Sequence, residues 1–185
     1  MPISFQEDRA TQVAARLTKL GGGTINHVKL IKLMYLVERT ALVKHGRLVT
    51  FDWLISMRHG PVLSATLNCI NDSVAPNESE RSYWHRYISA RENNEVSLVA
   101  EPLTDALSPA EVAIIDDTHA RYGWMETWAL VDWCHQHLPE WQDPGSSRLP
   151  IDLRAILASE HFIEEEIEEV MAAMDAEARL RQLTA

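Results

Sequence analysis

Apolar residues recur every three or four positions along much of this chain, which is the spacing of residues on one face of an α-helix. In residues 26–45, Leu30, Leu33 and Val37 form one such stripe, and Tyr35 belongs to a second stripe beside it. A helix that is apolar around so much of its surface usually lies in the centre of a core. The same periodicity, together with helix end signals, predicts further helices over residues 4–20, 62–70, 109–122, 126–138, 152–159 and 162–183.

The remaining face of the 26–45 helix is basic. Lys29, Lys32 and Arg39 lie within one narrow sector of it. Long cationic side chains commonly cover apolar neighbours while their charged ends stay in water. We therefore expect a solvated face, and a contact strip for an acidic partner is the alternative.

Residues typical of helix ends support these assignments. Ser4–Glu7 and Ser108–Glu111 both have the Ser-x-x-Glu pattern of a capping box, in which the two side chains bond free backbone N–H groups. Pro109 suits the first position of a helix, because the missing N–H would have no partner there. The glycines at 21–23 and Gly46 are typical of helix C-termini.

Three short runs are rich in β-branched and aromatic residues, which favours strands. They cover residues 53–58, 84–88 and 96–99, and the sequence ARENNE between the last two is typical of a hairpin turn. We expect the three strands to form one small sheet. After the first strand, Gly60 turns the chain, and Pro61 is expected in the first turn of the helix that follows.

The predicted fold class is therefore mainly α (α+β): a helical domain with a small antiparallel sheet of short strands and a long C-terminal amphipathic helix. We assign residues 1–142 to the domain, 143–150 to a polar linker, and 151–185 to a helical extension that packs on the domain or on a partner. The long helix of the extension is acidic in its first half and carries arginines near its end. That order matches the helix dipole.

Length, charge and cysteine content narrow the class of protein. A chain of 185 residues can bury a core as one domain without disulfides or metals. The formal net charge of −10 disfavours nucleic-acid binding, which needs a basic surface, although an autoregulatory DNA-binding protein is kept as an alternative. Cys69 and Cys134 form no disulfide or metal pattern, so we expect two buried thiols in a reducing, cytoplasmic setting. No signal peptide or membrane span is expected.

His59, within the sequence MRHGPV, is the candidate for acid–base catalysis. A general base needs an orienting partner and a cleft. Asp52 is the acidic residue upstream on the same predicted strand, and the G-x-S-x-G pattern of a nucleophile elbow is absent. We expect His59 to stabilise a turn rather than to catalyse, and a small hydrolase that uses it is the alternative.

Cys134 and His137 would share one face of a helix and are the candidates for metal ligands. A zinc site needs three or four converging ligands, and no second cluster of cysteine and histidine, no HExxH and no GxGxxG is present. We therefore expect neither a metal nor a cofactor and keep a metal-dependent enzyme as an alternative. The four tryptophans between residues 124 and 141 are expected to be core aromatics whose N–H groups find partners.

Residues 30–62, LIKLMYLVERTALVKHGRLVTFDWLISMRHGPV, resemble the Panacea domain, also called the SocA-like antitoxin domain. Members of that family have a Lys-Leu-x-Tyr-Leu helix, a Gly-Arg-x-x-Thr turn and a strand that ends in His-Gly-Pro-Val, and these correspond here to residues 32–36, 46–50 and 59–62. LSPAEVAIIDDTHARYG and WALVDWCHQHLPEW are similar to the family's capped helix and tryptophan-containing helix. The resemblance covers about residues 10–142.

The resemblance implies an antitoxin of a type II-like toxin–antitoxin pair, encoded by a bacterium or a phage. Such a protein neutralises a cognate protein toxin by direct binding and occlusion. The family has no agreed catalytic residues, so an enzyme is not expected. A ClpXP-type protease is a second candidate partner, because one founding member looks like a proteolytic adaptor, and a homodimer is a candidate assembly.

For the toxin interface we predict Arg47, Trp53, Arg58 and His59, because protein interfaces centre on aromatic residues and arginine. A place for Trp53 in the core is the favoured alternative. The acidic extension is expected to cover a basic toxin surface and to speed association. Truncation after Pro150 should therefore weaken toxin binding more than it lowers stability.

Overall fold

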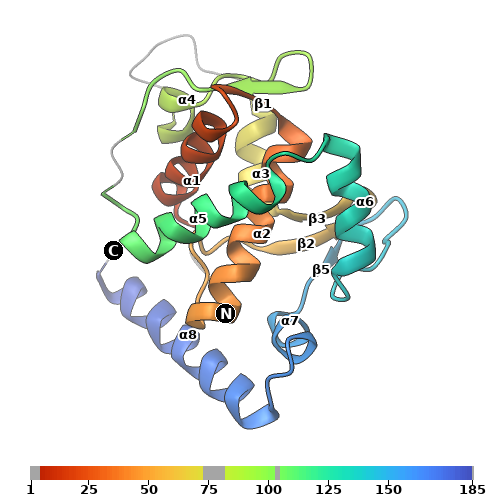
Figure 1. The fold of residues 1–185 in the computed structure, drawn as a ribbon. Coiled ribbons are helices and arrows are strands. Elements are labelled where there is room, and N and C mark those ends of the chain that lie inside the picture. Colours follow the sequence, from red (N-terminus) through yellow and green to blue (C-terminus); the bar gives the residue numbers. More distant parts are fainter. Residues whose placement is uncertain (1–4, 73–81, 103–104, 185) are drawn as a thin grey trace.

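The central element of the fold is α2 (His27–His45), in a computed structural model that describes residues 5–72, 82–102 and 105–184. Figure 1 shows α2 in the middle of the molecule, and it contacts α1, α5, α6 and α7. Asn26 caps its start by accepting a bond from the N–H of Val28, and Gly46 ends it in the left-handed conformation. The predicted apolar stripes are buried, so the central position of this helix is confirmed.

The described residues form eight helices and five short strands. The other helices are α1 (Glu7–Leu20), α3 (Ser64–Asn71), α4 (Tyr83–Tyr87), α5 (Pro109–Tyr122), α6 (Thr127–His137), α7 (Leu153–Ser159) and α8 (Glu164–Thr184). The strands are β1 (Thr24–Asn26), β2 (Leu54–Met57), β3 (Gly60–Leu63), β4 (Glu95–Ser97) and β5 (Leu149–Pro150). The mainly helical fold class with short antiparallel strands and a long last helix is confirmed.

The predicted pairing of the strands is wrong. The chain forms two sheets, one with the order β1-β4 and one with the order β3-β2-β5, so β4 pairs with β1 and not with β2. The predicted ARENNE turn is confirmed, because Glu92 and Glu95 exchange both backbone hydrogen bonds. Asn93 and Asn94 between them have φ of 50° and 66°. Positive φ at both central residues is the requirement of a type I′ hairpin turn.

The strand predicted over residues 84–88 is also wrong, because the short helix α4 occupies this segment. The Ser82 hydroxyl accepts a hydrogen bond from the N–H of His85, and the Glu7 carboxylate on α1 accepts one from the N–H of Trp84. Two N–H groups at the start of the helix are thereby satisfied. The contact with α1 therefore outweighs the strand preference of the aromatic residues.

The predicted helix over 62–70 begins later, at Ser64, because β3 comes first. The Asp52 carboxylate accepts hydrogen bonds from the N–H groups of Ala65 and Thr66, which fixes the start of α3. Pro61 therefore lies in a strand rather than in a helical turn. This is compatible with its missing N–H, because β3 is an edge strand.

The two predicted capping boxes have different outcomes. Ser4 lies outside the described residues, and α1 begins after Gln6 without a side-chain cap. The box at the start of α5 is confirmed, with reciprocal bonds between Ser108 and Glu111 and with proline at the first helical turn. Gly21 ends α1, as predicted.

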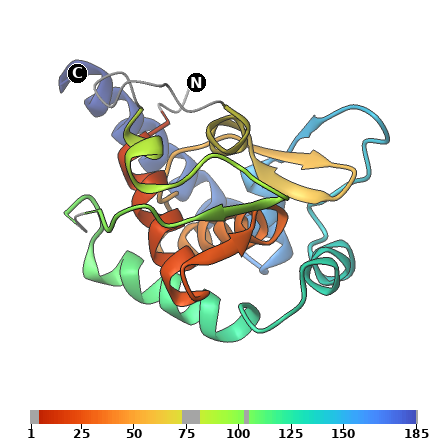
Figure 2. The ribbon, with the colours of Figure 1, turned by 90° about the horizontal axis from the view of Figure 1, so that it is seen from above.

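The C-terminal helices pack against the rest of the chain. Ile156 and Leu157 of α7 are completely buried, and Ile167 and Met174 of α8 are almost so; all four belong to the main hydrophobic core. Figure 2 shows α8 crossing behind α2 in the view from above. The last two residues of the predicted linker form β5, which pairs with β2. We therefore now expect truncation after Pro150 to cost stability directly.

Candidate functional site

The sequence MRHGPV forms the tight turn between β2 and β3. Met57 pairs with Gly60, so Arg58 and His59 are the two turn residues, and both are exposed. Neither has a positive φ, whereas Gly60 has a φ of 94°. A turn that places its left-handed residue after the two central positions needs glycine there. The hairpin therefore presents one arginine and one histidine at its tip.

Lys32, on α2, holds this hairpin in place through a hydrogen bond. Its Nζ donates a hydrogen bond of 2.7 Å to the carbonyl oxygen of Pro61, and the residue is only 1% exposed. A Cβ added to Gly60 would lie 3.1 Å from Lys32 Cε, so the glycine leaves the space that the lysine occupies. Burial lowers the pKa of Lys32 to about 7. The prediction of a solvated basic face on α2 is therefore wrong at its centre.

The other two cations of that face are also engaged. Lys29 donates to the carbonyl oxygen of Gly123. Arg39 forms ion pairs with Glu140 at 2.9 Å and with Glu160 at 2.7 Å. The basic sector of α2 thus holds the neighbouring helices instead of facing water.

His135 lies beside Lys32 and Gly60. Its ring stacks on Trp141, with centroids 4.0 Å apart, and the Trp141 indole N–H donates to the carbonyl oxygen of Met57. Burial and the nearby Lys32 lower the pKa of His135. Its Nε2 atom is buried and has no hydrogen-bond partner among the described residues. The hairpin is therefore anchored on both strands, through Pro61 to α2 and through Met57 to Trp141.

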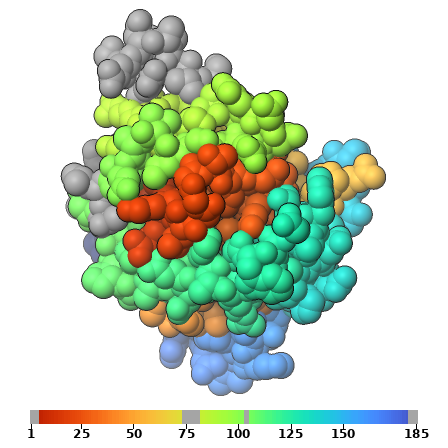
Figure 3. Space-filling view, turned by 45° about the horizontal axis from the view of Figure 1, so that its top comes forward, coloured from red at the N-terminus to blue at the C-terminus, as the bar shows by residue number. Residues whose placement is uncertain are grey.

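The hairpin tip contacts an exposed tryptophan near the start of α6. The His59 ring contacts the Trp128 ring edge to face, at 5.5 Å between centroids. Trp128 is 59% exposed, and Trp124, in the turn between α5 and α6, is 77% exposed. In Figure 3 the hairpin tip reaches the edge of the visible face beside α6. We call Arg58, His59, Trp124 and Trp128 the hairpin–α6 surface.

The four residues predicted for a partner interface do not form one site. Arg58 and His59 lie together at the hairpin tip. Trp53 lies at the opposite end of β2, and it is 50% exposed, so the alternative that it is a core residue is wrong. It borders a cavity that is also lined by Met171 of α8. Arg47 is half-buried, and its guanidinium bonds the Glu111 carboxylate at 3.0 Å.

The alternative of a hydrolase based on His59 finds no support in the arrangement of its neighbours. Both Asp52 oxygens are occupied by Trp53 N–H and by groups at the start of α3, so this carboxylate does not orient an imidazole. Asp52 is a helix cap. The contact that the structure gives the His59 ring is Trp128.

The alternative of a metal-dependent enzyme with Cys134 and His137 as ligands also finds no support in the structure. Cys134 is completely buried, and burial raises the pKa of its thiol to about 11. His137 is exposed, bonds the carbonyl oxygen of Trp133 through Nδ1 and stacks on the Trp133 ring. Within residues 5–72, 82–102 and 105–184 there is no group of three or more histidine, cysteine or acidic side chains that could hold a metal. Cys69 is half-buried rather than buried, and burial raises the pKa of its thiol to about 12.

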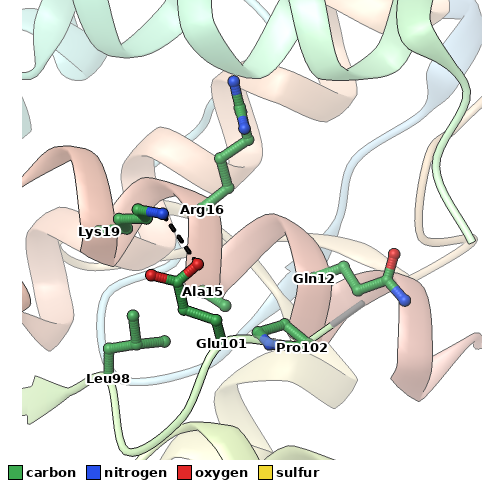
Figure 4. Close-up of a pocket in the computed structure, with 7 residues that line it drawn as sticks. All are labelled: Gln12, Ala15, Arg16, Lys19, Leu98, Glu101 and Pro102. Carbon is green, nitrogen blue, oxygen red and sulfur yellow. Dashed lines mark hydrogen bonds and ion pairs between the residues drawn. The ribbon is translucent and has the colours of Figure 1, made fainter. Parts of the chain in front are cut away.

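A small pocket on α1 is also explained by the fold. Figure 4 shows Gln12, Arg16, Lys19 and Glu101 around it. Lys19 pairs with Glu101, Arg16 pairs with Asp116 on α5, and Gln12 bonds the segment that precedes α5. These polar side chains are already used to hold α1 in place, so the pocket carries no argument for a ligand.

Sequence reasoning placed Trp124 and Trp128 in the core, and this was wrong. The helical periodicity of the sequence contained a sign that Trp128 is exposed. In α6 the buried residues are Leu130, Val131 and Cys134, and Trp128 points away from that stripe. Trp141 does follow the prediction, since it is half-buried and its N–H is bonded.

The structure is thus a helical domain in which the cations of α2 bond neighbouring segments. Aromatic and cationic side chains are exposed at the β2–β3 hairpin. Residues 30–142 match the family described as antitoxin SocA-like, Panacea domain, which is more than half of the chain. The chain belongs to this family of antitoxins. No curated protein and no solved structure matches it. No helix in the described part of the chain is long and apolar enough to cross a membrane.

Proposed function

We propose that this protein is the antitoxin of a type II-like toxin–antitoxin pair and that it neutralises its toxin by direct binding and occlusion. Membership of the SocA-like family supports a cognate protein toxin as the partner. Occlusion requires a surface that covers the active or target-binding face of the toxin. It requires no catalytic group on the antitoxin.

The observation that carries the proposal is the exposed Trp128 ring in contact with His59 at the hairpin tip, where Arg58 is the other turn residue. Tryptophan and arginine are the residue types that most often dominate the free energy of protein–protein binding. A large aromatic side chain in water loses the free energy that its burial would provide. An exposed tryptophan in contact with a hairpin tip that also carries an arginine therefore favours a surface that is covered in a complex.

The surface is also held in shape before it binds. Lys32 and Trp141 anchor the two strands of the hairpin, and the ring contact between His59 and Trp128 joins the hairpin to α6. A preorganised surface loses less conformational entropy when it binds. The net charge of −10 further favours fast association with a basic toxin.

The other contacts and partners that the sequence predicts remain separate proposals. Trp53 is exposed and could meet a second region of the toxin, at the far end of β2. Arg47 could contribute only with the part of its side chain that Glu111 leaves free. A ClpXP-type protease and a second copy of the chain are further proposed partners, and no residue on the hairpin–α6 surface distinguishes them.

The first test is to capture the partner. The tagged protein is purified from its native host, and proteins that co-elute at equal stoichiometry are identified by mass spectrometry. We expect a small protein encoded next to this one that stops growth when expressed alone and not when co-expressed. Failure to find any stoichiometric partner at low salt would contradict the proposal.

The second test locates the interface on the captured toxin. Trp128→Ala is expected to abolish rescue of growth and to weaken binding by about 100-fold, the effect of losing a hot-spot tryptophan. Trp53→Ala is the comparison variant, a 50% exposed tryptophan at the other end of β2, and we expect it to weaken binding less than Trp128→Ala does. A larger loss for Trp53→Ala than for Trp128→Ala would place the interface at the other end of β2.

A further inference from the structure

A cavity of about 400 Å³ lies between α2, the end of α5, α6 and the end of α7. We propose that it binds a nucleotide, a nucleoside phosphate. Three of its lining residues carry cationic side chains: Arg39, Lys44 and Arg121. The one carboxylate in the lining, Glu160, is paired with Arg39. The cavity is within the size range of small-molecule sites, and its basic lining stands out in a chain with a net charge of −10.

The phosphate end is defined by two cations of the lining that have no carboxylate partner in the described part of the chain, Lys44 and Arg121. Arg39 donates through Nε to Glu140, through Nη1 to Glu160 and through Nη2 to Ser159. These bonds hold its guanidinium in place in the lining of the cavity. Lys44 and Arg121 are exposed, and neither is ion-paired to any carboxylate in the described part of the chain. They come from different helices and line the same cavity. Two converging cations are the usual means of holding a phosphate.

Basic residues at helix C-termini have another common explanation, since they complement the helix dipole. That effect is weak at exposed positions and requires no cavity. The terminal carbonyl groups nearby already have partners, because Gly46 N–H bonds Leu42 oxygen and Gly123 N–H bonds His119 oxygen. Within the described residues the Lys44 ammonium and the Arg121 guanidinium donate no hydrogen bond to the protein, and Arg121 lies 5.2 Å from the centroid of the Tyr122 ring. Both groups therefore remain available for an anion.

The base end is defined by a set of aromatic rings. Trp133 stacks on His137 with centroids 4.7 Å apart and an angle of 6°, and Tyr122 lies against Trp133 at 4.7 Å. The His137 ring is exposed, so a base can continue the stack on its open face. His137 Nδ1 bonds the carbonyl oxygen of Trp133, which can only accept, so Nδ1 carries the proton. Nε2 is left to accept a hydrogen bond from an exocyclic amino group.

The test is isothermal titration of the full chain with ATP, AMP, adenosine and inorganic phosphate. We expect ATP and AMP to bind, and adenosine and phosphate each to bind at least about tenfold more weakly, because each fills only one end. Lys44→Ala and Arg121→Ala should each weaken ATP binding at least about tenfold, the loss of one charge-assisted hydrogen bond. Arg86→Ala removes an exposed cation on α4, far from the cavity lining, and should change nothing.

Three results with nucleotide or phosphate would overturn the proposal. They are the absence of binding by ATP and AMP at millimolar concentration, equal affinity for phosphate and AMP, and equal affinity of the Lys44→Ala and Arg86→Ala variants. Binding of an oligoglutamate peptide in place of nucleotides would assign the cavity to an acidic protein segment and would also overturn it. The outcome is independent of the toxin, since the cavity shares no residue with the hairpin–α6 surface.

Discussion

Lys32 and Arg39 lie two turns apart on the same face of α2, but their side chains have different kinds of partner. Both are shielded from water, but Lys32 meets one neutral carbonyl group, whereas Arg39 meets the carboxylates of Glu140 and Glu160. Burial lowers the pKa of Lys32 to about 7. Burial also acts to lower the pKa of Arg39, but the two carboxylates outweigh it and the pKa is raised.

The difference separates two ways of using a buried cation. At Arg39 a permanent charge fastens α7 and the segment after α6 onto the core. At Lys32 a charge without a counter-ion supports a hairpin whose tip we propose to be functional. The first arrangement stabilises the fold, and the second accepts a cost in stability to shape a surface.

Of the changes that test this comparison, truncation after Pro150 is expected to have the largest effect on stability. It removes the Glu160 partner of Arg39 and exposes the core that Ile156 and Leu157 cover. Complete burial of one such side chain is worth about 1.5–3 kcal/mol, so the truncated chain should lose most of its stability. Urea unfolding followed by circular dichroism measures the loss. A truncated chain with an unchanged unfolding midpoint would show that the extension does not belong to the core.

Glu140→Gln tests the paired side alone. The Glu140 carboxylate accepts from the Tyr35 hydroxyl and from Arg39, and its side chain is fully buried. Removing one partner of a buried ion pair should lower the free energy of unfolding by about 3 kcal/mol. Glu160→Gln is the matched control, because its carboxylate is 39% exposed, and it should cost under about 1 kcal/mol. Equal losses in the two variants would contradict the assignment of Glu140 as the buried anchor.

Gly60→Ala tests the unpaired side through its packing. The new methyl group would sit 3.1 Å from Lys32 Cε, at a φ of 94° that side chains disfavour. We expect a loss of about 2–4 kcal/mol, from backbone strain and overpacking together. Gly145→Ala is the control, since Gly145 also has a positive φ but has nothing within 4 Å of the added methyl. If both variants lose the same amount in thermal unfolding, the contact with Lys32 has no part in the effect.

Lys32→Met should have an effect that depends clearly on pH. The pKa of Lys32 falls from 10.5 to about 7 in the fold, so between those pH values the unfolded chain binds a proton that the native chain lacks. Stability of the parent protein should therefore rise with pH in that window, by at most about 1.4 kcal/mol per pH unit from this group.

The Lys32→Met variant should lose that slope, and its advantage over the parent should be largest below pH 7. Lys29→Met is the control, because Lys29 is also on α2 and also donates to a carbonyl oxygen, that of Gly123, but is only half-buried. Urea unfolding at several pH values between 6 and 10 measures the slopes. An unchanged slope in Lys32→Met would mean that the lysine stays charged in the fold.

Local patterns in the sequence predicted what local forces decide. The apolar stripes and end signals located α2, α5 and α6, because Asn26, Gly46 and the Ser108–Glu111 box act within a few residues. The identity of α4 was missed, since it depends on Glu7, far away on α1. The pairing of β4 with β1 was missed for the same reason, because each partner is distant in sequence.

The candidate site was predicted only in part. The sequence pointed to Arg58 and His59, which the structure places together, but the burial of Lys32 depends on the missing side chain of Gly60 in another element. Trp128 was assigned to the core by its residue type, although its position on α6 lies outside the buried stripe. Residue type alone therefore misplaced the aromatic part of the surface.

The central claim is that the hairpin–α6 surface binds the toxin. Its most direct test is titration calorimetry of the co-purified toxin with the parent protein and with Trp128→Ala, alongside a melting curve of each. The account predicts an affinity lower by about 100-fold with little change in melting temperature, because Trp128 is mostly exposed. Parent-like affinity of Trp128→Ala would contradict it.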